Sequence, residues 1–131
     1  MPNDIIVAKK EELTTLQMEK GISEILKPLT KEIFLFDTYV AGTTHLKKQM
    51  VLDTVKQDDK LILRREANKF DEMAILILDG AGEKLGYVPE KDNVVFARLM
   101  DAGKCLTAKV RSHSERNGFH EIRIGIFLVD F

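Results

Sequence analysis

A short, continuously apolar run at residues 74–78 (Ala-Ile-Leu-Ile-Leu) constrains the fold more than any other feature of this chain. The turn sequence Asp-Gly-Ala-Gly at residues 79–82 ends it. Such a run predicts a strand that is buried on both faces. Residues 84–88 continue as a second short strand, and the Asp-Gly pair between the two predicts a hairpin.

Strand signals occupy most of the chain after residue 32. Residues 33–36 and 39–40 are aromatic and β-branched, and residues 60–65 form an aliphatic run between polar segments. The following residues, 66–71, are polar and predict a loop or one helical turn.

The end of the chain predicts two further strands, at residues 104–113 and 119–131, joined by a loop at 114–118. In the last of them Ile122, Ile124 and Ile126 recur with a period of two.

Two segments carry helical signals instead. Apolar residues recur near helical spacing between residues 90 and 102, after Pro89 and before Gly103. Residues 9–27 predict one or two short amphipathic helices that end before Pro28. We therefore expect an N-terminal helical extension at residues 1–32 and a mainly β domain at residues 33–131. With about six strands and one inserted helix, an α+β fold built on a small curled sheet or barrel is predicted.

Composition limits the classes of function. A chain of 131 residues with 44% hydrophobic residues makes one small globular domain. The formal net charge of −1 argues against coating a long phosphate backbone, but it leaves room for a small site that recognises an end or a few nucleotides. No apolar run reaches 18 residues and the N-terminus does not look like a signal peptide, so we expect a cytoplasmic protein.

Catalytic and metal-binding signatures are weak. Cys105 lies in a strand pattern and is predicted to be a buried structural thiol. His45, His113 and His120 are too far apart in the sequence for a metal-ligand motif. We therefore predict no enzyme activity, no metal and no cofactor.

Basic and aromatic residues provide the remaining candidates. Arg64, Arg65 and Lys69 lie close to Phe70, a combination that can stack bases and neutralise phosphates. Core packing of Phe70 is an equally open alternative. Residues 104–123 are locally basic, and a solvated strand face is the simpler explanation of that charge.

Three runs together resemble the HIRAN domain family: residues 39–45 (Tyr-Val-Ala-Gly-Thr-Thr-His), residues 59–75, which contain Asn68-Lys69-Phe70-Asp71, and residues 84–89 (Lys-Leu-Gly-Tyr-Val-Pro). The resemblance covers about residues 34–131 and implies a modified OB-like or SH3-like β-barrel with inserted helices. Family members include bacterial proteins in which the domain stands nearly alone. The eukaryotic members bind single-stranded DNA and capture a free 3′-hydroxyl end.

The resemblance also implies roles for individual residues. Asp71 would sense the 3′-hydroxyl and Phe70 would form an aromatic wall. The other residues implied to bind nucleic acid are Thr44, His45, Arg64, Arg65, Asn68, Tyr87, Lys91 and Phe119. Thr44 and His45 stand where DNA-binding members carry a basic and then an aromatic residue.

The resemblance therefore implies a non-enzymatic module that binds single-stranded DNA, with a preference for 3′ ends, in DNA repair or replication-fork processing. The alternative is a protein-interaction or scaffold module with the same barrel and no DNA ligand. The helix at residues 9–27 is predicted to serve in packing or in contact with a second copy of the chain, and recruitment of a protein partner is the alternative.

Overall fold

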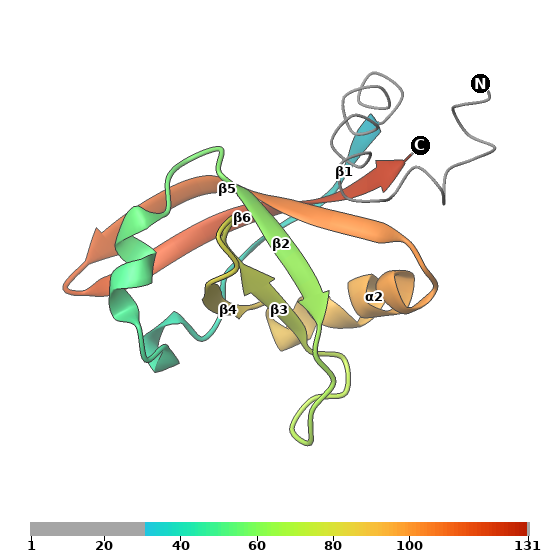
Figure 1. Cartoon of the computed structure of the whole chain (residues 1–131), viewed down its shortest axis with the longest axis horizontal. Coiled ribbons are helices and arrows are strands. Elements are labelled where there is room, and N and C mark those ends of the chain that lie inside the picture. The colour runs from blue at the N-terminus through green and yellow to red at the C-terminus, as the bar shows by residue number, and fades with distance from the viewer. Residues whose placement is uncertain (1–30, 131) are drawn as a thin grey trace, which may run out of the picture. The chain divides into compact units, whose positions relative to one another are not determined.

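Six strands form one curled antiparallel sheet in the computed structural model, which describes residues 31–130. Their spatial order is β1-β6-β5-β2-β3-β4. In Figure 1 the two longest strands, β5 and β6, run side by side. The bounds are β1 (Lys31–Tyr39), β2 (Lys60–Arg65), β3 (Ile75–Leu78), β4 (Lys84–Tyr87), β5 (Cys105–Arg116) and β6 (Phe119–Asp130). The helix predicted at residues 9–27 lies outside the described residues, and the domain boundary after residue 32 stays a prediction.

The two edges of the sheet meet just after β1. Ala41 and Tyr87 exchange two backbone hydrogen bonds, with N···O distances of 2.8 Å from Ala41 N and 2.9 Å from Tyr87 N. Gly86 makes this approach feasible, since a Cβ atom there would come within 2.3 Å of the Ala41 carbonyl oxygen. The strands therefore curl into a half-barrel whose edges are joined by this single bridge.

Helix α2 (Glu90–Asp101) and two short 3₁₀ helices accompany the sheet. Phe96 and Ala97 of α2 belong to the hydrophobic core together with Leu52 and Val55 from the η4 region. The 3₁₀ helices η3 (Thr43–His45) and η4 (Gln49–Thr54) occupy a segment for which the sequence predicted no structure. Among the described residues, no helix is long and apolar enough to cross a membrane.

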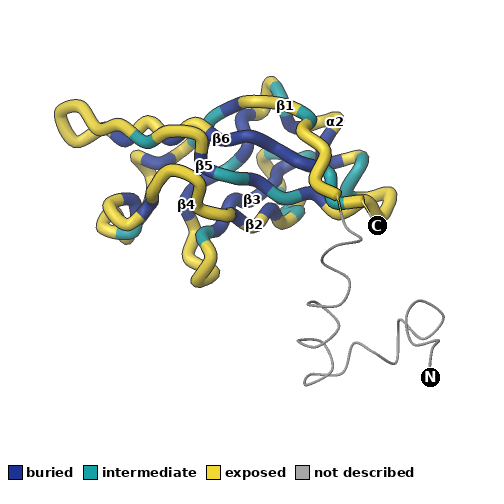
Figure 2. Tube along the Cα trace, turned by 90° about the horizontal axis from the view of Figure 1, so that it is seen from above, coloured by how far each residue is buried: buried dark blue, intermediate teal, exposed yellow. Residues whose placement is uncertain are grey.

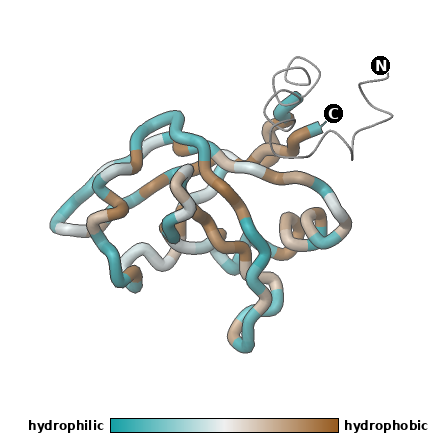
Figure 3. The backbone as a smooth tube through the Cα atoms, in the orientation of Figure 1, coloured by the Kyte–Doolittle hydropathy of each residue, from teal (hydrophilic) through white to brown (hydrophobic). Residues whose placement is uncertain are grey.

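The core follows the predicted alternation. All four residues of β3 are buried, as a continuously apolar strand requires, and Ile122, Ile124 and Ile126 of β6 are fully buried. Figure 2 shows the middle of β6 as buried, and Figure 3 shows hydrophobic strands between hydrophilic turns.

Two local predictions were wrong. The loop predicted at residues 114–118 is largely strand, because β5 runs to Arg116 and only Asn117 and Gly118 form the turn, both with positive φ (53° and 80°). An Asn-Gly pair suits such a two-residue hairpin.

Cys105 is exposed rather than buried. It is the first residue of β5, and its side chain lies on the same face as those of the half-buried Thr107 and Lys109. The buried residues Leu106 and Ala108 lie on the opposite face.

Candidate functional site

The loop between β2 and β3 is organised by one asparagine. The Asn68 side-chain oxygen accepts hydrogen bonds from the backbone N–H groups of Phe70 (2.8 Å) and Asp71 (2.9 Å). Asn68 N–H in turn donates to the Asp71 carbonyl at 3.1 Å. These bonds form a compact turn, and the Phe70 ring projects from it with 84% of the residue exposed.

The Asp71 carboxylate is held on both oxygens. Met73 N–H donates to Oδ1 and the Asn93 side-chain amide donates to Oδ2, each at 2.8 Å. Asn93 is only 2% exposed and lies on the buried face of α2. The first turn of this helix is also tied to β1, because Thr38 Oγ1 donates to Asp92 Oδ2 at 2.8 Å. Helix α2 therefore fixes the orientation of Asp71.

A pocket of about 300 Å³ opens beside Phe70 and Asp71. It lies where the loop, the Ala41–Tyr87 bridge and the start of α2 meet. Its lining is mostly apolar, and its two carboxyl groups belong to Asp71 and Glu90. The lining residues are Ala41, Gly42, Asn68, Phe70, Asp71, Ala74, Tyr87, Val88 and Glu90.

Tyr87 is fixed within the wall of this pocket. Its hydroxyl donates to the Glu66 carboxylate and accepts a hydrogen bond from Lys84 Nζ at 3.2 Å. Lys84 Nζ also lies 4.7 Å from the centre of the Tyr87 ring, and Lys69 Nζ lies 5.1 Å from the centre of the Phe70 ring. Two lysines therefore stand beside the two aromatic rings of the pocket.

Arg64, Arg65 and Lys91 were predicted to contact phosphates, and they differ in their surroundings. Arg64 is exposed on β2 and shares a face of the sheet with Leu76 and, one strand further, Tyr87. Lys91 follows Glu90 in the first turn of α2, with Nζ 3.2 Å from Asp92 Oδ2.

The Arg65 side chain is held by hydrogen bonds within the protein. Its guanidinium donates to both carboxylate oxygens of Asp101 (2.9 and 3.2 Å) and to the carbonyls of Ala74 (2.6 Å) and Glu72 (2.8 Å). These bonds connect the end of α2 to the β3 region, and they engage all three guanidinium nitrogens of Arg65.

Thr44, His45 and Phe119 are not among the residues that line the pocket. Thr44 and His45 are exposed on η3, which begins directly after Gly42. Thr43 Oγ1 donates weakly, at 3.5 Å, to the carbonyl of His120, so the start of β6 adjoins η3. Phe119 is 52% exposed there.

The cations of the terminal hairpin lie elsewhere. Lys109 Nζ is 2.8 Å from Glu32 Oε1, and this hydrogen bond, opposed by partial burial, holds the pKa of Glu32 below its usual value of 4.5. Arg111 Nε is 3.2 Å from Asp37 Oδ1. Neither cation lines the pocket beside Asp71.

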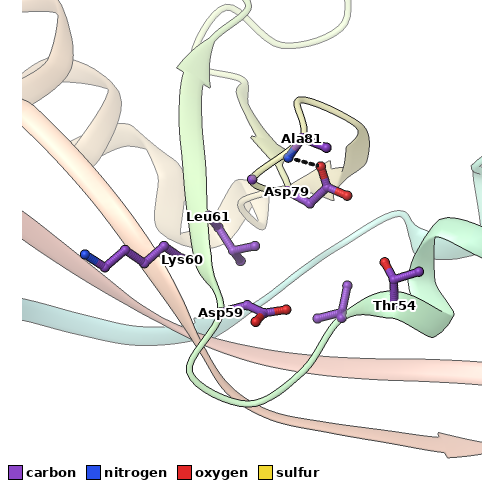
Figure 4. Close-up of a pocket in the computed structure, with 8 residues that line it drawn as sticks. Thr54, Asp59, Lys60, Leu61, Asp79 and Ala81 are labelled. Carbon is purple, nitrogen blue, oxygen red and sulfur yellow. Dashed lines mark hydrogen bonds between the residues drawn. The ribbon is translucent and has the colours of Figure 1, made fainter. Parts of the chain in front are cut away.

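A second pocket, of about 380 Å³, is shown in Figure 4. Asp59 and Asp79 line it, and both carboxylates hold turns: Asp59 accepts from Lys56 N–H, and Asp79 accepts from the Ala81 and Glu83 N–H groups, all within 2.8–2.9 Å. Lys60 points away from the pocket. These carboxylates therefore have structural partners, and we do not assign a ligand to this pocket.

Two histidines that are seven residues apart meet across the β5–β6 hairpin. His113 Nε2 and His120 Nδ1 are 2.8 Å apart, and His113 Nδ1 lies 2.8 Å from the Val55 carbonyl oxygen. Within residues 31–130, no group of three or more His, Cys, Asp or Glu side chains could hold a metal ion.

Asn93 and Glu90 were missed by the sequence reasoning. A signal for Asn93 was present, because it lies three residues before Phe96 on the apolar stripe of the helix, where a polar side chain needs a buried partner. Glu90 carried no such signal.

Comparisons with known proteins agree with this architecture. The HIRAN domain family model matches residues 33–129. A crystal structure of a protein from Lactobacillus plantarum superposes with a TM-score of 0.72 at 23% identity, over 78% of this chain and 99% of that one. The crystal structure of the HIRAN domain of human HLTF superposes with a TM-score of 0.62 at 17% identity, over 77% and 79% of the two chains. No curated protein sequence matches. Because the family model covers most of the chain, the chain belongs to the HIRAN domain family.

Proposed function

We propose that this domain binds single-stranded DNA and that the pocket beside Phe70 and Asp71 receives a free 3′-hydroxyl end. The observation that carries the proposal is the combination, in one pocket, of an exposed aromatic ring and an immobilised carboxylate. HIRAN domains are generally associated with DNA binding, and a role in DNA repair or replication-fork processing is part of this proposal.

The chemistry of the pocket favours a chain end. The terminal base stacks on Phe70, and the 3′-hydroxyl donates to a free lone pair of the Asp71 carboxylate. An internal nucleotide carries a phosphodiester at this position, which has no proton to donate and is negatively charged. Asp71 and Glu90 would both repel it. The nearby Lys69 and Lys84 can reach phosphates on the 5′ side of the terminal nucleotide.

End capture is tested with short 5′-labelled single strands that carry either a 3′-hydroxyl or a 3′-phosphate, by fluorescence anisotropy. The parent should prefer the 3′-hydroxyl strand, and Asp71→Ala should lower its affinity by about 1 to 3 kcal/mol, the usual size of one strong polar contact. Asp79→Ala is the matched control, because the Asp79 carboxylate also accepts two hydrogen bonds but lies in the β3–β4 turn.

Equal binding of the two strands by the parent would contradict end capture, as would an Asp71→Ala variant that still discriminates. If no strand binds, or if the affinity does not fall as the salt concentration rises, a protein-interaction module is the better description.

Stacking is tested separately with Phe70→Ala. We expect a loss of about 1 to 3 kcal/mol in affinity for either strand. Because the residue is 84% exposed, the unfolding midpoint should not change. Phe70→Trp should retain binding, and Met50→Ala, at a residue that is 75% exposed, controls for loss of an exposed apolar side chain. A Phe70→Ala variant with parental affinity would contradict the stacking role.

A further inference from the structure

A β-bulge in β5 places one arginine outside the regular pairing. Val110 pairs with Ile124 and Ser112 pairs with Arg123, so Arg111 has no partner residue on β6. Bulges of this kind turn the extra side chain out of the normal alternation and are frequent beside functional sites.

The Arg111 guanidinium is fixed by several neighbours. Its Nε lies 3.2 Å from Asp37 Oδ1, and its central carbon lies 5.1 Å from the Phe34 ring centre and 5.4 Å from the Phe127 ring centre. Gly125 lies directly beneath, where a Cβ atom would come within 2.7 Å of Nε. The guanidinium therefore rests on the β6 backbone in a space that only a glycine leaves open.

A hollow of about 320 Å³ lies beside this arginine, lined by Asp37, Arg111, Ser112, Arg123 and Ile124. The Arg123 side chain is 47% exposed, and its ion pair with Glu121 is long, at 3.9 Å. Among residues 31–130, the hydrogen bonds of the Arg111 side chain involve Nε alone, so its two terminal nitrogens still have donors to offer.

We propose that this hollow binds a backbone phosphodiester of the strand whose 3′ end occupies the pocket beside Asp71; the inference rests on the proposed function. Two guanidinium groups and a hydroxyl supply the donors that a phosphate oxygen requires. Two arginines and one aspartate give a formal charge of +1 for the lining. That charge suits the single negative charge of a phosphodiester better than the double charge of a phosphate monoester.

The position of the hollow along β1 supports a continuous path. Asp37 lines the hollow and Ala41 lines the pocket, and four residues of extended chain span about 13 Å. Tyr39 lies between them, and Lys91 Nζ is 5.6 Å from the centre of its ring. A DNA strand that runs back from the pocket would therefore meet the Tyr39 ring and the Lys91 ammonium group before it reached the hollow. Sites of about 4 to 16 nucleotides are usual for OB-like domains.

Strands of increasing length, all with a 3′-hydroxyl, test this path by anisotropy at several salt concentrations. Parental affinity should rise with length once the strand reaches the hollow. Arg123→Gln should lower the affinity for long strands about 5- to 10-fold and reduce the salt slope by about one, as expected for one lost phosphate contact. The preference for the 3′-hydroxyl over the 3′-phosphate should persist.

Gly125→Ala is the sharper variant, because it keeps both arginines and the net charge but displaces the Arg111 guanidinium. It should lower the affinity for long DNA strands as Arg123→Gln does and leave the affinity for the shortest DNA strands unchanged. Lys56→Gln, which removes one positive charge next to Val55 and the pocket of Figure 4, is the control and should change little. If both hollow variants bind long strands like the parent while end preference is intact, the hollow site is wrong and the proposed function stands.

A second measurement is independent of DNA binding. Diethyl phosphate is a phosphodiester without a base or a chain end, and its titration can be followed by NMR at the arginine Nε–H groups. We expect saturable shifts at Arg111 and Arg123 that weaken in Gly125→Ala, with smaller shifts for inorganic phosphate. Absence of any shift would overturn the hollow site. If the parent shows these shifts but binds no DNA strand, the proposed function is wrong, and so is the assignment of the hollow to a DNA strand.

Discussion

The pocket beside Asp71 and the hollow beside Arg111 each contain a charged side chain that is held by its neighbours, and the two side chains have opposite charge. Asp71 is held by the uncharged donors Met73 N–H and Asn93, and Arg111 by a carboxylate, two aromatic rings and a glycine. An acidic pocket can select a hydroxyl end, and a basic hollow can attract the chain behind it. This division would let a protein with a net charge of −1 carry the proposed nucleic-acid site.

A glycine supports each site, and the two glycines have different neighbours. At Gly86 an added Cβ atom would collide with backbone, the Ala41 carbonyl oxygen at 2.3 Å. At Gly125 it would meet the end of a flexible side chain, the Arg111 Nε at 2.7 Å. The first glycine therefore maintains the fold, while the second maintains only the position of a guanidinium.

Gly86→Ala should give the largest effect. The new methyl group would force Ala41 and Tyr87 apart and break the two hydrogen bonds that join the sheet edges, at a cost on the order of 3 kcal/mol. Urea denaturation measures the loss, with Gly125→Ala as the control, which should unfold at the parental midpoint. Equal destabilisation of the two variants would show that the two glycines do not differ in this way.

The pocket beside Asp71 was only partly predictable. Asn68, Phe70 and Asp71 come from one turn, and Tyr87 ends a hairpin that the Asp-Gly pair indicates, but the roles of Asn68, Asp71 and Tyr87 were implied by the family resemblance and not by the local pattern. Local sequence determines local geometry in such segments. Even here, the donor to Asp71 comes from Asn93, 22 residues away, which required knowledge of how α2 packs.

The hollow could not be predicted from the sequence, because three strands supply it. Asp37 and Arg111 are 74 residues apart, and the bulge that turns Arg111 out depends on the register of β5 against β6. Basic residues in this hairpin were visible, but their partners on β1 were not. For the same reason the meeting of His113 and His120 across the hairpin escaped the sequence analysis.

Asn93→Ala should have an intermediate effect that separates positioning from stability. Loss of the 2.8 Å bond to Asp71 Oδ2 should cost about 1 to 2 kcal/mol of stability and reduce the preference for a 3′-hydroxyl several-fold. Thr38→Val is the matched control, because it removes the other bond to the first turn of α2, at Asp92, without touching Asp71. Both variants should be destabilised, as measured by thermal melting, but only Asn93→Ala should lose end preference. A parallel loss in Thr38→Val would mean that the helix as a whole, and not Asn93, sets the orientation of Asp71.

The smallest expected effect is the loss of the stabilising contribution of Glu32 in acid. The pKa of Glu32 is lowered mainly by its hydrogen bond with Lys109, whose Nζ also lies 5.1 Å from the Phe127 ring that contacts Arg111. A carboxyl group with a lowered pKa in the folded state stabilises the protein above its usual value of 4.5, and this contribution disappears as the pH falls through the lowered pKa. The Glu32 and Lys109 side chains are 33% and 30% exposed, so solvent screens the pair and the effect is small. The urea midpoint of Glu32→Gln should therefore lie slightly below that of the parent at pH 7, and the two midpoints should converge as the pH falls from 4.5 through the lowered pKa. A difference that persists unchanged after the pH has fallen through the lowered pKa would assign the role of Glu32 to packing and not to its charge.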